Sequence, residues 1–287
     1  MIGWLCGLGS AVLYGVSDFV GGLASRRAHF VVVALLGQCA GLLVSAAAGP
    51  LIKAQSPSHA DLWWGALSGL GTAAGMVFLF RGLSRGAMSV IVPTSAVTGI
   101  LLPVLVGVVV EHERPSVPAW AGIALAVPAL WLVSGSLSRT GSSSGGVGDG
   151  LIAGIGIAVQ YLALAHASSA AGLWPVATGR VSAVGVLFTL FLVLALRRTD
   201  DRVGTAQLRM PATPFALATA AGVTAAAALA AYLVATHHQI TAIAVVLSSL
   251  YPVIPVILGI TVLHERLSRR QAAGVVGAGA AIALLAA

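Results

Sequence analysis

Charged residues are scarce in this chain, and their scarcity determines its broad class. Only 8% of the 287 residues are charged, whereas a soluble domain carries roughly 25%. Hydrophobic residues make up 58% of the chain, and its mean hydropathy is +1.00. Because so few charges could not cover a water-facing surface of this size, the composition predicts a protein that is solvated by lipid.

Other absences exclude whole classes of function. The two cysteines, Cys6 and Cys39, are too few for a disulfide framework or a metal site. The net charge of +7 comes from arginines between apolar runs, with no basic stripe of the kind that binds nucleic acid. The chain has no His-Glu-x-x-His motif, and no Gly-x-Ser-x-Gly sequence that is supported by the strand-to-helix elbow of a nucleophilic serine. We therefore expect neither an enzyme nor a protein that holds a cofactor, a metal or nucleic acid.

Long apolar runs are what the chain has instead. A helix needs roughly 20 apolar residues to cross the hydrocarbon layer of a membrane, and ten runs of about that length divide the sequence. The first starts at Ile2 without a basic segment before it, so we predict a retained helix and not a signal peptide. The fold class that follows is an all-α integral membrane protein with ten transmembrane helices. The runs are 2–24, 29–49, 62–82, 87–110, 117–136, 150–168, 172–196, 213–236, 240–263 and 269–287.

The ten runs divide into two halves of five. Residues 137–149 are rich in Ser and Gly and read as a flexible linker, which leaves 1–136 and 150–287 as the halves. A shift of 152 residues places Pro103–Gly122 over Pro255–Gly274, where ten of the twenty positions are identical. Both segments contain His-Glu-Arg, a match that an abundance of Ala and Val does not produce by chance. The sequence therefore predicts an internal duplication.

An odd number of crossings in each half has a consequence for topology. The second half must enter the membrane from the side opposite to the first. Inverted repeats of this kind are the usual architecture of alternating-access transporters. The duplication thus predicts two five-helix halves that pack upside down relative to one another.

These residues resemble a known family. A five-helix unit that is used twice, with prolines inside its fourth helix and a glutamate at the end of that helix (Glu113 and Glu265), is similar to the EamA branch of the drug/metabolite transporter superfamily. That family often has an arginine in the second helix of a half, a position that Arg180 matches and that Gln38 occupies in the first half. The resemblance covers nearly the whole chain and implies a ten-helix transporter of small metabolites or drugs, often an exporter.

Two charged residues lie firmly inside predicted spans, Asp18 in the first and Arg180 in the seventh. A charge at the centre of a helix costs about 2.5–3.5 kcal/mol on insertion scales, so such a residue is a functional candidate by default. For Asp18 the alternative is that it reaches toward Arg26 or Arg27 at the end of its span. For Arg180 the alternative is a structural bond between helices. We predict that Arg180 binds an anionic or zwitterionic solute, and that Asp18 is the proton-linked group because an apolar setting favours a neutral carboxyl.

Further polar residues gather near the middle of their runs, close to prolines that break the helical hydrogen-bond ladder. Freed carbonyl groups need partners in lipid, so these faces are expected to point into the protein or toward a wet cavity. The alternative is ordinary hydrogen bonding between helices, worth about 0.6 kcal/mol on average. The predicted helix breaks are Pro93, Pro103, Pro252 and Pro255, and the predicted substrate-binding residues are Tyr14, Thr72, Thr94, Ser95, Thr98, Gln160, Tyr161, Arg180, Tyr232, Ser248 and Tyr251.

Two glutamates have a simpler interpretation. Glu113 and Glu265 each precede a new helix, where a carboxylate interacts well with free N–H groups and the positive end of the helix dipole. We therefore expect each of them to cap the helix that follows it.

The arginines give an orientation. Twelve lie after odd-numbered runs, whereas only Lys53 and Arg114 lie on the other side, and positive residues favour the cytoplasmic side. We therefore expect both termini to lie outside the cytoplasm, in a multi-pass protein of the plasma (bacterial inner) membrane. The twelve are Arg26, Arg27, Arg81, Arg85, Arg139, Arg197, Arg198, Arg202, Arg209, Arg266, Arg269 and Arg270.

Together these features predict a secondary transporter, most simply an exporter, of a small organic metabolite or drug. Its partners would be that solute, membrane lipid and, if transport is coupled, protons. The alternative is a polytopic membrane enzyme or a flippase-like protein that uses the central cavity for a lipid headgroup. The missing catalytic residues argue against the enzyme.

Overall fold

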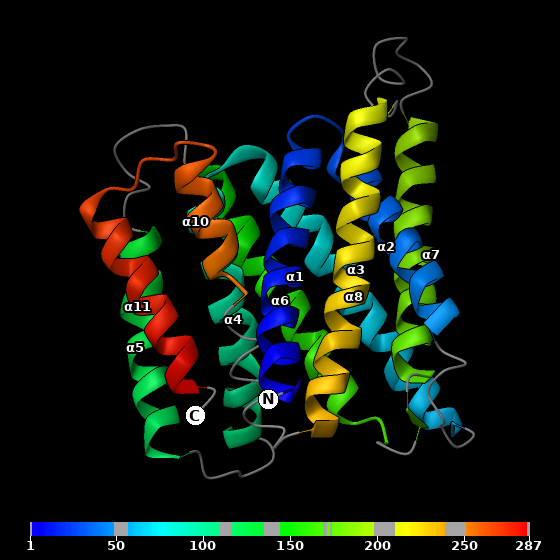
Figure 1. Ribbon diagram of the computed structural model, residues 1–287, viewed down its shortest axis with the longest axis horizontal. Coiled ribbons are helices and arrows are strands. Elements are labelled where there is room, and N and C mark those ends of the chain that lie inside the picture. Colours follow the sequence, from blue (N-terminus) through cyan, green and yellow to red (C-terminus); the bar gives the residue numbers. More distant parts are fainter. Residues whose placement is uncertain are drawn as a thin grey trace.

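The computed structural model describes residues 2–48, 57–109, 116–134, 144–168, 171–172, 174–197, 210–238 and 251–285. The long elements in these ranges are all α-helices, packed side by side in one bundle (Figure 1). In chain order they are α1 (Ile2–Ser25), α2 (Phe30–Ala48), α3 (His59–Arg85), α4 (Met88–Val109), α5 (Val117–Ser134), α6 (Ser144–Ala165), α7 (Trp174–Arg197), α8 (Ala212–His238), α10 (Val253–Thr261) and α11 (Arg269–Leu285).

The helices follow the apolar runs of the sequence, with one clear difference. Helix α6 begins at Ser144, so residues 144–149 of the predicted linker are helical. Gly146 allows this, because a Cβ atom there would lie 2.7 Å from Cδ1 of Ile91. A residue without a side chain thus lets the first turn of α6 lie against α4, although the same residue type suggested a loop in the sequence. Of the predicted ninth run, 240–263, residues 240–250 lie outside the described ranges.

Six of the described helices are long and apolar enough to cross a membrane by length and composition. Two further apolar stretches, Met88–Pro103 and Trp120–Ala129, are shorter. The described structure is therefore all-helical with six candidate spans, fewer than the ten crossings that the sequence predicts. The six are Leu5–Ser25, Phe30–Ala47, His59–Arg85, Gly146–Ala165, Trp174–Arg197 and Ala212–Leu229.

Helix packing divides most of the bundle into two units. Helix α8 packs extensively on α1 and also on α2, while α3 packs on α6 and α7, and α4 packs on α6. We call α1, α2 and α8 the first packing unit, and α3, α4, α6 and α7 the second. Contacts between the units, such as those of α1 with α3 and of α2 with α7, are sparser. Each unit thus combines helices from both halves of the sequence.

Small residues bring the helices of each unit close together. In the second unit, a Cβ atom on Gly156 of α6 would lie 2.5 Å from the backbone nitrogen of Gly75 in α3. In the first unit, the hydroxyls of Ser10 and Ser17 donate across to carbonyl oxygens of α8 at 2.9 and 2.8 Å. Close approach of backbones and interhelical hydrogen bonds are the interactions that join helices in lipid, where the hydrophobic effect is absent.

A third pair of helices, α5 and α11, lies at one edge of the bundle and packs mainly on itself (Figure 1). Its contact is built from alanines, including Ala126, Ala129, Ala278 and Ala281. The first turn of α1 and the last turn of α11 lie at the same end of the bundle (Figure 1). At the opposite end, where α1 and α3 finish, Phe80, Leu83 and Met88 are fully buried.

The four prolines occupy two kinds of position. Pro93 and Pro103 both lie inside α4, which continues as one helix from Met88 to Val109. Pro252 is the N-cap residue of α10, and Pro255 lies in its first turn and is fully buried. The proline ring suits the start of a helix because the missing N–H group has no partner there in any case.

Candidate solute-binding site

Asp18 lies in α1 with its side chain only partly exposed. Within the described ranges the two ion pairs join Arg26 to Glu265 and Arg81 to Asp149. Asp18 therefore makes no ion pair with Arg26 or Arg27 there. One turn earlier on the same face of α1 stands Tyr14, since residues four apart are neighbours on a helix surface.

Arg180 lies in the first half of α7 and points toward α2. Its Nη1 donates to Oε1 of Gln38 at 3.3 Å, and a side chain at Gly41 would collide with the guanidinium group. The Nε atom is buried and has no hydrogen-bond partner among the described residues. A guanidinium has five donors in a fixed fork and no acceptor. Arg180 therefore lies between helices and retains a donor for a further acceptor.

Three of the chain's four tyrosines lie near Asp18, and one of these three also lies near Arg180. Tyr14 lies within electrostatic range of both Asp18 and Arg180, and Tyr161 and Tyr251 lie within range of Asp18. Tyr232 lies within range of Tyr14 and Tyr161. The structure thus brings together predicted site residues from α1, α6, α7, α8 and the turn before α10.

Two of the tyrosines touch directly. The rings of Tyr14 and Tyr251 meet edge to face, with their centroids 6.4 Å apart and their planes at 60°. This arrangement is the favoured geometry of an aromatic pair. Tyr161 differs from these two because its side chain is 51% exposed. Tyr14 and Tyr251 contact one another, whereas Tyr161 presents part of its side chain at the surface of α6.

The hydroxyl residues of α4 lie elsewhere, in the contact with α6. Thr94, Ser95 and Thr98 are buried, and their hydroxyls donate to carbonyl oxygens of α4 itself at 2.8–2.9 Å. Gly150 and Gly154 of α6 pack directly on them. Since these hydroxyl protons are engaged within the helix, the residues could meet a solute only through their oxygen lone pairs.

The remaining predicted site residues are placed as follows. Thr72 in α3 is half-buried and donates to the carbonyl oxygen of Ser68 at 3.0 Å. Gln160 precedes Tyr161 in α6, with its backbone against Gly71. Ser248 lies outside the described residues.

Glu265 corrects one expectation from the sequence. It does not cap α11, the helix that follows it, because Ser268 and Gln271 form a reciprocal capping box there with bonds of 3.0 and 3.2 Å. Its carboxylate instead accepts from the backbone nitrogens of Met88 and Ser89 at 2.9 and 3.0 Å, at the start of α4. The chemistry is the one predicted, a carboxylate at a helix N-terminus, but the helix is distant in sequence. Glu113 lies outside the described residues.

Two polar contacts could not be found by reasoning along the sequence. Gln38 was identified only as the counterpart of Arg180 in the other half, whereas the structure places the two side chains in direct contact. Asp149 was assigned to the linker, yet it is buried and accepts from Nε of Arg81 at 2.9 Å. A second nitrogen of Arg81 also binds the same carboxylate oxygen. An aspartate in a Gly-rich segment carries no local signal for either burial or partner.

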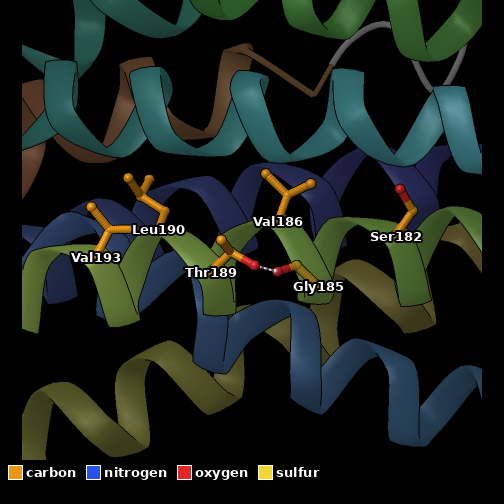
Figure 2. Close-up of a pocket in the computed structure, with 6 residues that line it drawn as sticks. All are labelled: Ser182, Gly185, Val186, Thr189, Leu190 and Val193. Atoms are coloured by element: carbon orange, nitrogen blue, oxygen red, sulfur yellow. Dashed lines mark hydrogen bonds between the residues drawn. The ribbon is translucent and has the colours of Figure 1, made fainter. Parts of the chain in front are cut away.

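A groove of about 540 Å³ runs along α7. It is lined by one face of that helix, as Figure 2 shows. Thr189 donates to the carbonyl oxygen of Gly185 at 2.9 Å, so its hydroxyl is engaged within the helix. An open, mainly apolar groove on a candidate span suits an acyl chain of the lipid better than a polar solute. Its lining residues are Ser182, Gly185, Val186, Thr189, Leu190 and Val193.

Comparison with known proteins gives a family and a fold. Residues 1–135 match the model of the EamA-like transporter family. No curated protein sequence matches the chain. A crystal structure of a protein with 17% sequence identity has a TM-score of 0.59 and covers 99% of this chain and 96% of that chain. At this identity the likeness shows the fold alone.

Proposed function

We propose that this chain is a secondary transporter of a small organic solute, because residues 1–135 match the model of the EamA-like transporter family. The family and the apolar helices make it an integral membrane protein. The class of solute, the direction of transport and the coupling ion are further parts of the proposal.

Arg180 carries the proposal for the solute. A permanently charged side chain between α7 and α2, with a buried Nε atom that lacks a partner among the described residues, favours a ligand with a carboxylate or another anionic group. Its nearest polar contact, Gln38, is neutral, so no described residue neutralises the guanidinium directly. An anionic or zwitterionic solute would supply that charge, with the four tyrosines contributing aromatic faces and hydroxyls. The proposed direction is export.

Alternating access is supported by the way the helices pair. If α1–α5 correspond to α6–α11, then α1 on α8 and α3 on α6 are matching contacts, and so are α2 on α8 and α3 on α7. Two halves related by a two-fold axis would produce matched pairs of this kind. This pattern supports residues 1–136 and 150–287 as inverted repeats, which is the architecture that lets one protein adopt two mirror-related states.

For orientation we propose that the arginine-rich end, where α1 and α3 finish, faces the cytoplasm across the plasma membrane. Three exposed tryptophans support this, because Trp63, Trp120 and Trp174 lie near the first residues of their helices at the other end, whereas a fourth, Trp131, lies near the last residues of α5. Such residues gather at membrane interfaces. For coupling, Asp18 is the proposed proton-linked group.

A proteoliposome screen tests the proposal. Purified protein is reconstituted, and uptake of anionic, zwitterionic and cationic small organic solutes is measured with and without a proton gradient. We expect at least one anionic or zwitterionic solute to accumulate above the level in protein-free liposomes, and faster when the gradient is present. Accumulation restricted to cations would contradict the role of Arg180, and scrambling of a labelled lipid without solute uptake would favour the flippase-like alternative.

A further inference from the structure

The end of the bundle where α1 and α3 finish contains a polar cluster that no role in solute binding explains. Its centre is Glu265, whose side chain is only 10% exposed. One carboxylate oxygen accepts from the backbone nitrogen of Met88, and the other accepts from the backbone nitrogen and the hydroxyl of Ser89, the latter at 2.6 Å. Glu265, which lies between α10 and α11, thus caps the N-terminus of α4, a helix of the second packing unit.

Arg26 brings the first packing unit into the same cluster. It stands just after α1, and its Nη2 donates to Oε1 of Glu265 and to the carbonyl oxygen of Gly86, both at 3.1 Å. Its Nε donates to the carbonyl oxygen of Leu83 at 3.1 Å, at the end of α3. One arginine therefore joins the end of α1 to the turn between α3 and α4, with Glu265 between them.

The apolar contacts beneath this cluster are equally close. A Cβ atom at Gly21 would lie 2.5 Å from the Phe80 ring, and one at Gly22 would lie 2.6 Å from Cε of Met88. Glycines in α1 therefore let its last two turns lie directly on α3 and α4. The two packing units are closed against one another at this end.

A second ion pair at the same end provides a contrast. Arg81 and Asp149 join α3 to α6, and Asp61 joins the other ends of these two helices by accepting from the backbone nitrogen of Ser168 at 2.7 Å. Since α3 and α6 are tied at both ends and belong to the same unit, the Arg81–Asp149 pair holds one unit together. The Arg26–Glu265 pair, with the bonds from Arg26 to the carbonyl oxygens of Leu83 and Gly86, joins α1 of the first unit to the α3–α4 turn of the second unit.

We propose that Arg26 and Glu265 form a latch that closes this end of the transporter, and that the two packing units, not the two halves of the sequence, move against one another when it opens. The latch rests on the proposed alternating access. For this end to open, Arg26 must leave both Glu265 and the turn after α3. The other described polar contact between the units is the hydrogen bond from Arg180 to Gln38. This contact lies at the proposed solute site, so a solute that accepted a hydrogen bond from Arg180 would weaken it.

Hydrogen exchange in lipid nanodiscs tests the latch without any solute. Glu265→Gln keeps the size of the side chain but removes its charge, and a hydrogen bond to a charged group is stronger than one to a neutral group. We expect exchange in peptides covering 17–26 and 83–92 to rise about tenfold or more. At the opposite end, peptides covering 40–47 and 174–182 should become more protected, since opening one end closes the other.

Asp149→Asn is the matched control. It neutralises the other paired carboxylate at the same end of the bundle, so it carries the same change of charge. We expect faster exchange only at the adjoining ends of α3 and α6, with no gain of protection at the opposite end. Faster exchange at both ends in Glu265→Gln, or no change, would overturn the latch. Should Glu265→Gln fail to fold, Arg26→Gln makes the same test, since it leaves Glu265 on α4.

Cross-linking decides which parts move. In a background where Cys6 and Cys39 are serine, Gly22→Cys with Leu83→Cys joins the two units, because a Cβ at Gly22 would lie 3.4 Å from that of Leu83. Gly99→Cys with Ile157→Cys, at 3.2 Å, joins α4 to α6 inside one unit but across the sequence halves. Both distances are close to the roughly 3.5–4.5 Å of disulfides.

The two disulfides should behave differently. The first should abolish the exchange response to Glu265→Gln, and a reducing agent should restore it, whereas the second should leave the response in place. Suppression by the second disulfide would show that the sequence halves move, and would overturn the assignment of the units. Neither measurement uses a solute. The exchange and cross-linking experiments can therefore refute the latch while the uptake screen supports solute transport, or support the latch while the uptake screen finds no transport.

Discussion

At the scale of single residues, the main finding is how differently the two intramembrane charges are surrounded. Arg180 is held between α7 and α2 by Gln38, with Gly41 leaving room for its guanidinium group. Asp18 makes no ion pair within the described ranges and stands near three tyrosines. The first is a fixed charge, and the second is a carboxyl that is able to gain or lose a proton. These properties suit a binding group and a coupling group respectively.

Arg180→Gln tests the binding role. The change should weaken binding of the transported solute by roughly 10- to 100-fold, because a hydrogen bond to a charged group contributes about 1.5–3 kcal/mol. The midpoint of thermal unfolding should stay nearly unchanged, since glutamine can still meet Gln38. Binding is measured by isothermal titration with a solute from the uptake screen. Arg180→Lys, which keeps the charge, should lose less affinity, and normal binding by the glutamine variant would refute the assignment.

Asp18→Asn tests the coupling role separately. The neutral amide can neither take up nor release a proton, so the rate of uptake should no longer respond to an imposed proton gradient. Binding of the solute should remain, because Arg180 is intact. The measurement compares uptake into proteoliposomes at two gradients for the variant and the original chain. A gradient response that survives the substitution would show that protons are coupled elsewhere or not at all.

At the scale of elements, Gly156 of α6 and Gly185 of α7 have opposite surroundings. Gly156 in α6 faces α3 at a separation that leaves no space for a methyl group, whereas nothing lies within 4 Å of a Cβ at Gly185 in α7. The first residue makes the contact between α3 and α6 possible. The second faces the groove of Figure 2. The same residue type is therefore required for packing at Gly156 and dispensable at Gly185.

Alanine substitutions measure this difference. Gly156→Ala should destabilise the protein by about 1–3 kcal/mol, because the helices must separate to admit the methyl group. Gly185→Ala should be neutral or slightly stabilising, since alanine is the better helix former by about 0.5–1 kcal/mol. Thermal unfolding of the two purified variants under one set of conditions gives the comparison. Equal effects at the two positions would show that α3 and α6 are less closely packed than described.

At the scale of the whole molecule, the chain begins and ends at the same end of the bundle (Figure 1), and α3 and α7 end in Arg85 and Arg197 at the other end. By the positive-inside tendency, we propose that this other, arginine-rich end faces the cytoplasm. The latch lies at that arginine-rich end, so under the proposed orientation the described state is closed toward the cytoplasm.

Labelling of single cysteines tests the orientation. In a cysteine-free background, a cysteine at Ser142 or Thr205 should resist an impermeant thiol reagent in intact cells, and a cysteine at Ser58 should react. The first two positions lie outside the described residues, and Ser58 precedes α3. All three should react after the cells are permeabilised. Protection of Ser58 with labelling of the other two would reverse the orientation.

The sequence by itself determined what depends on composition and period. The apolar runs located the described helices, because lipid demands about 20 apolar residues per crossing, and the His-Glu-Arg repeat with internal prolines led to the EamA family, whose model residues 1–135 match. It also selected Asp18, Arg180 and the four tyrosines, since polar groups in a long apolar helix are conspicuous.

Only the tertiary structure decided which distant groups meet. It joined Glu265 to the start of α4, Asp149 to Arg81, and Arg180 to Gln38. It also placed the hydroxyl-bearing residues of α4 in the contact with α6. It also built packing units that cross the boundary between the sequence halves. The physical reason is that a helix satisfies its own backbone locally, whereas a side chain or an uncapped terminus takes whichever partner the packing of the bundle brings near it.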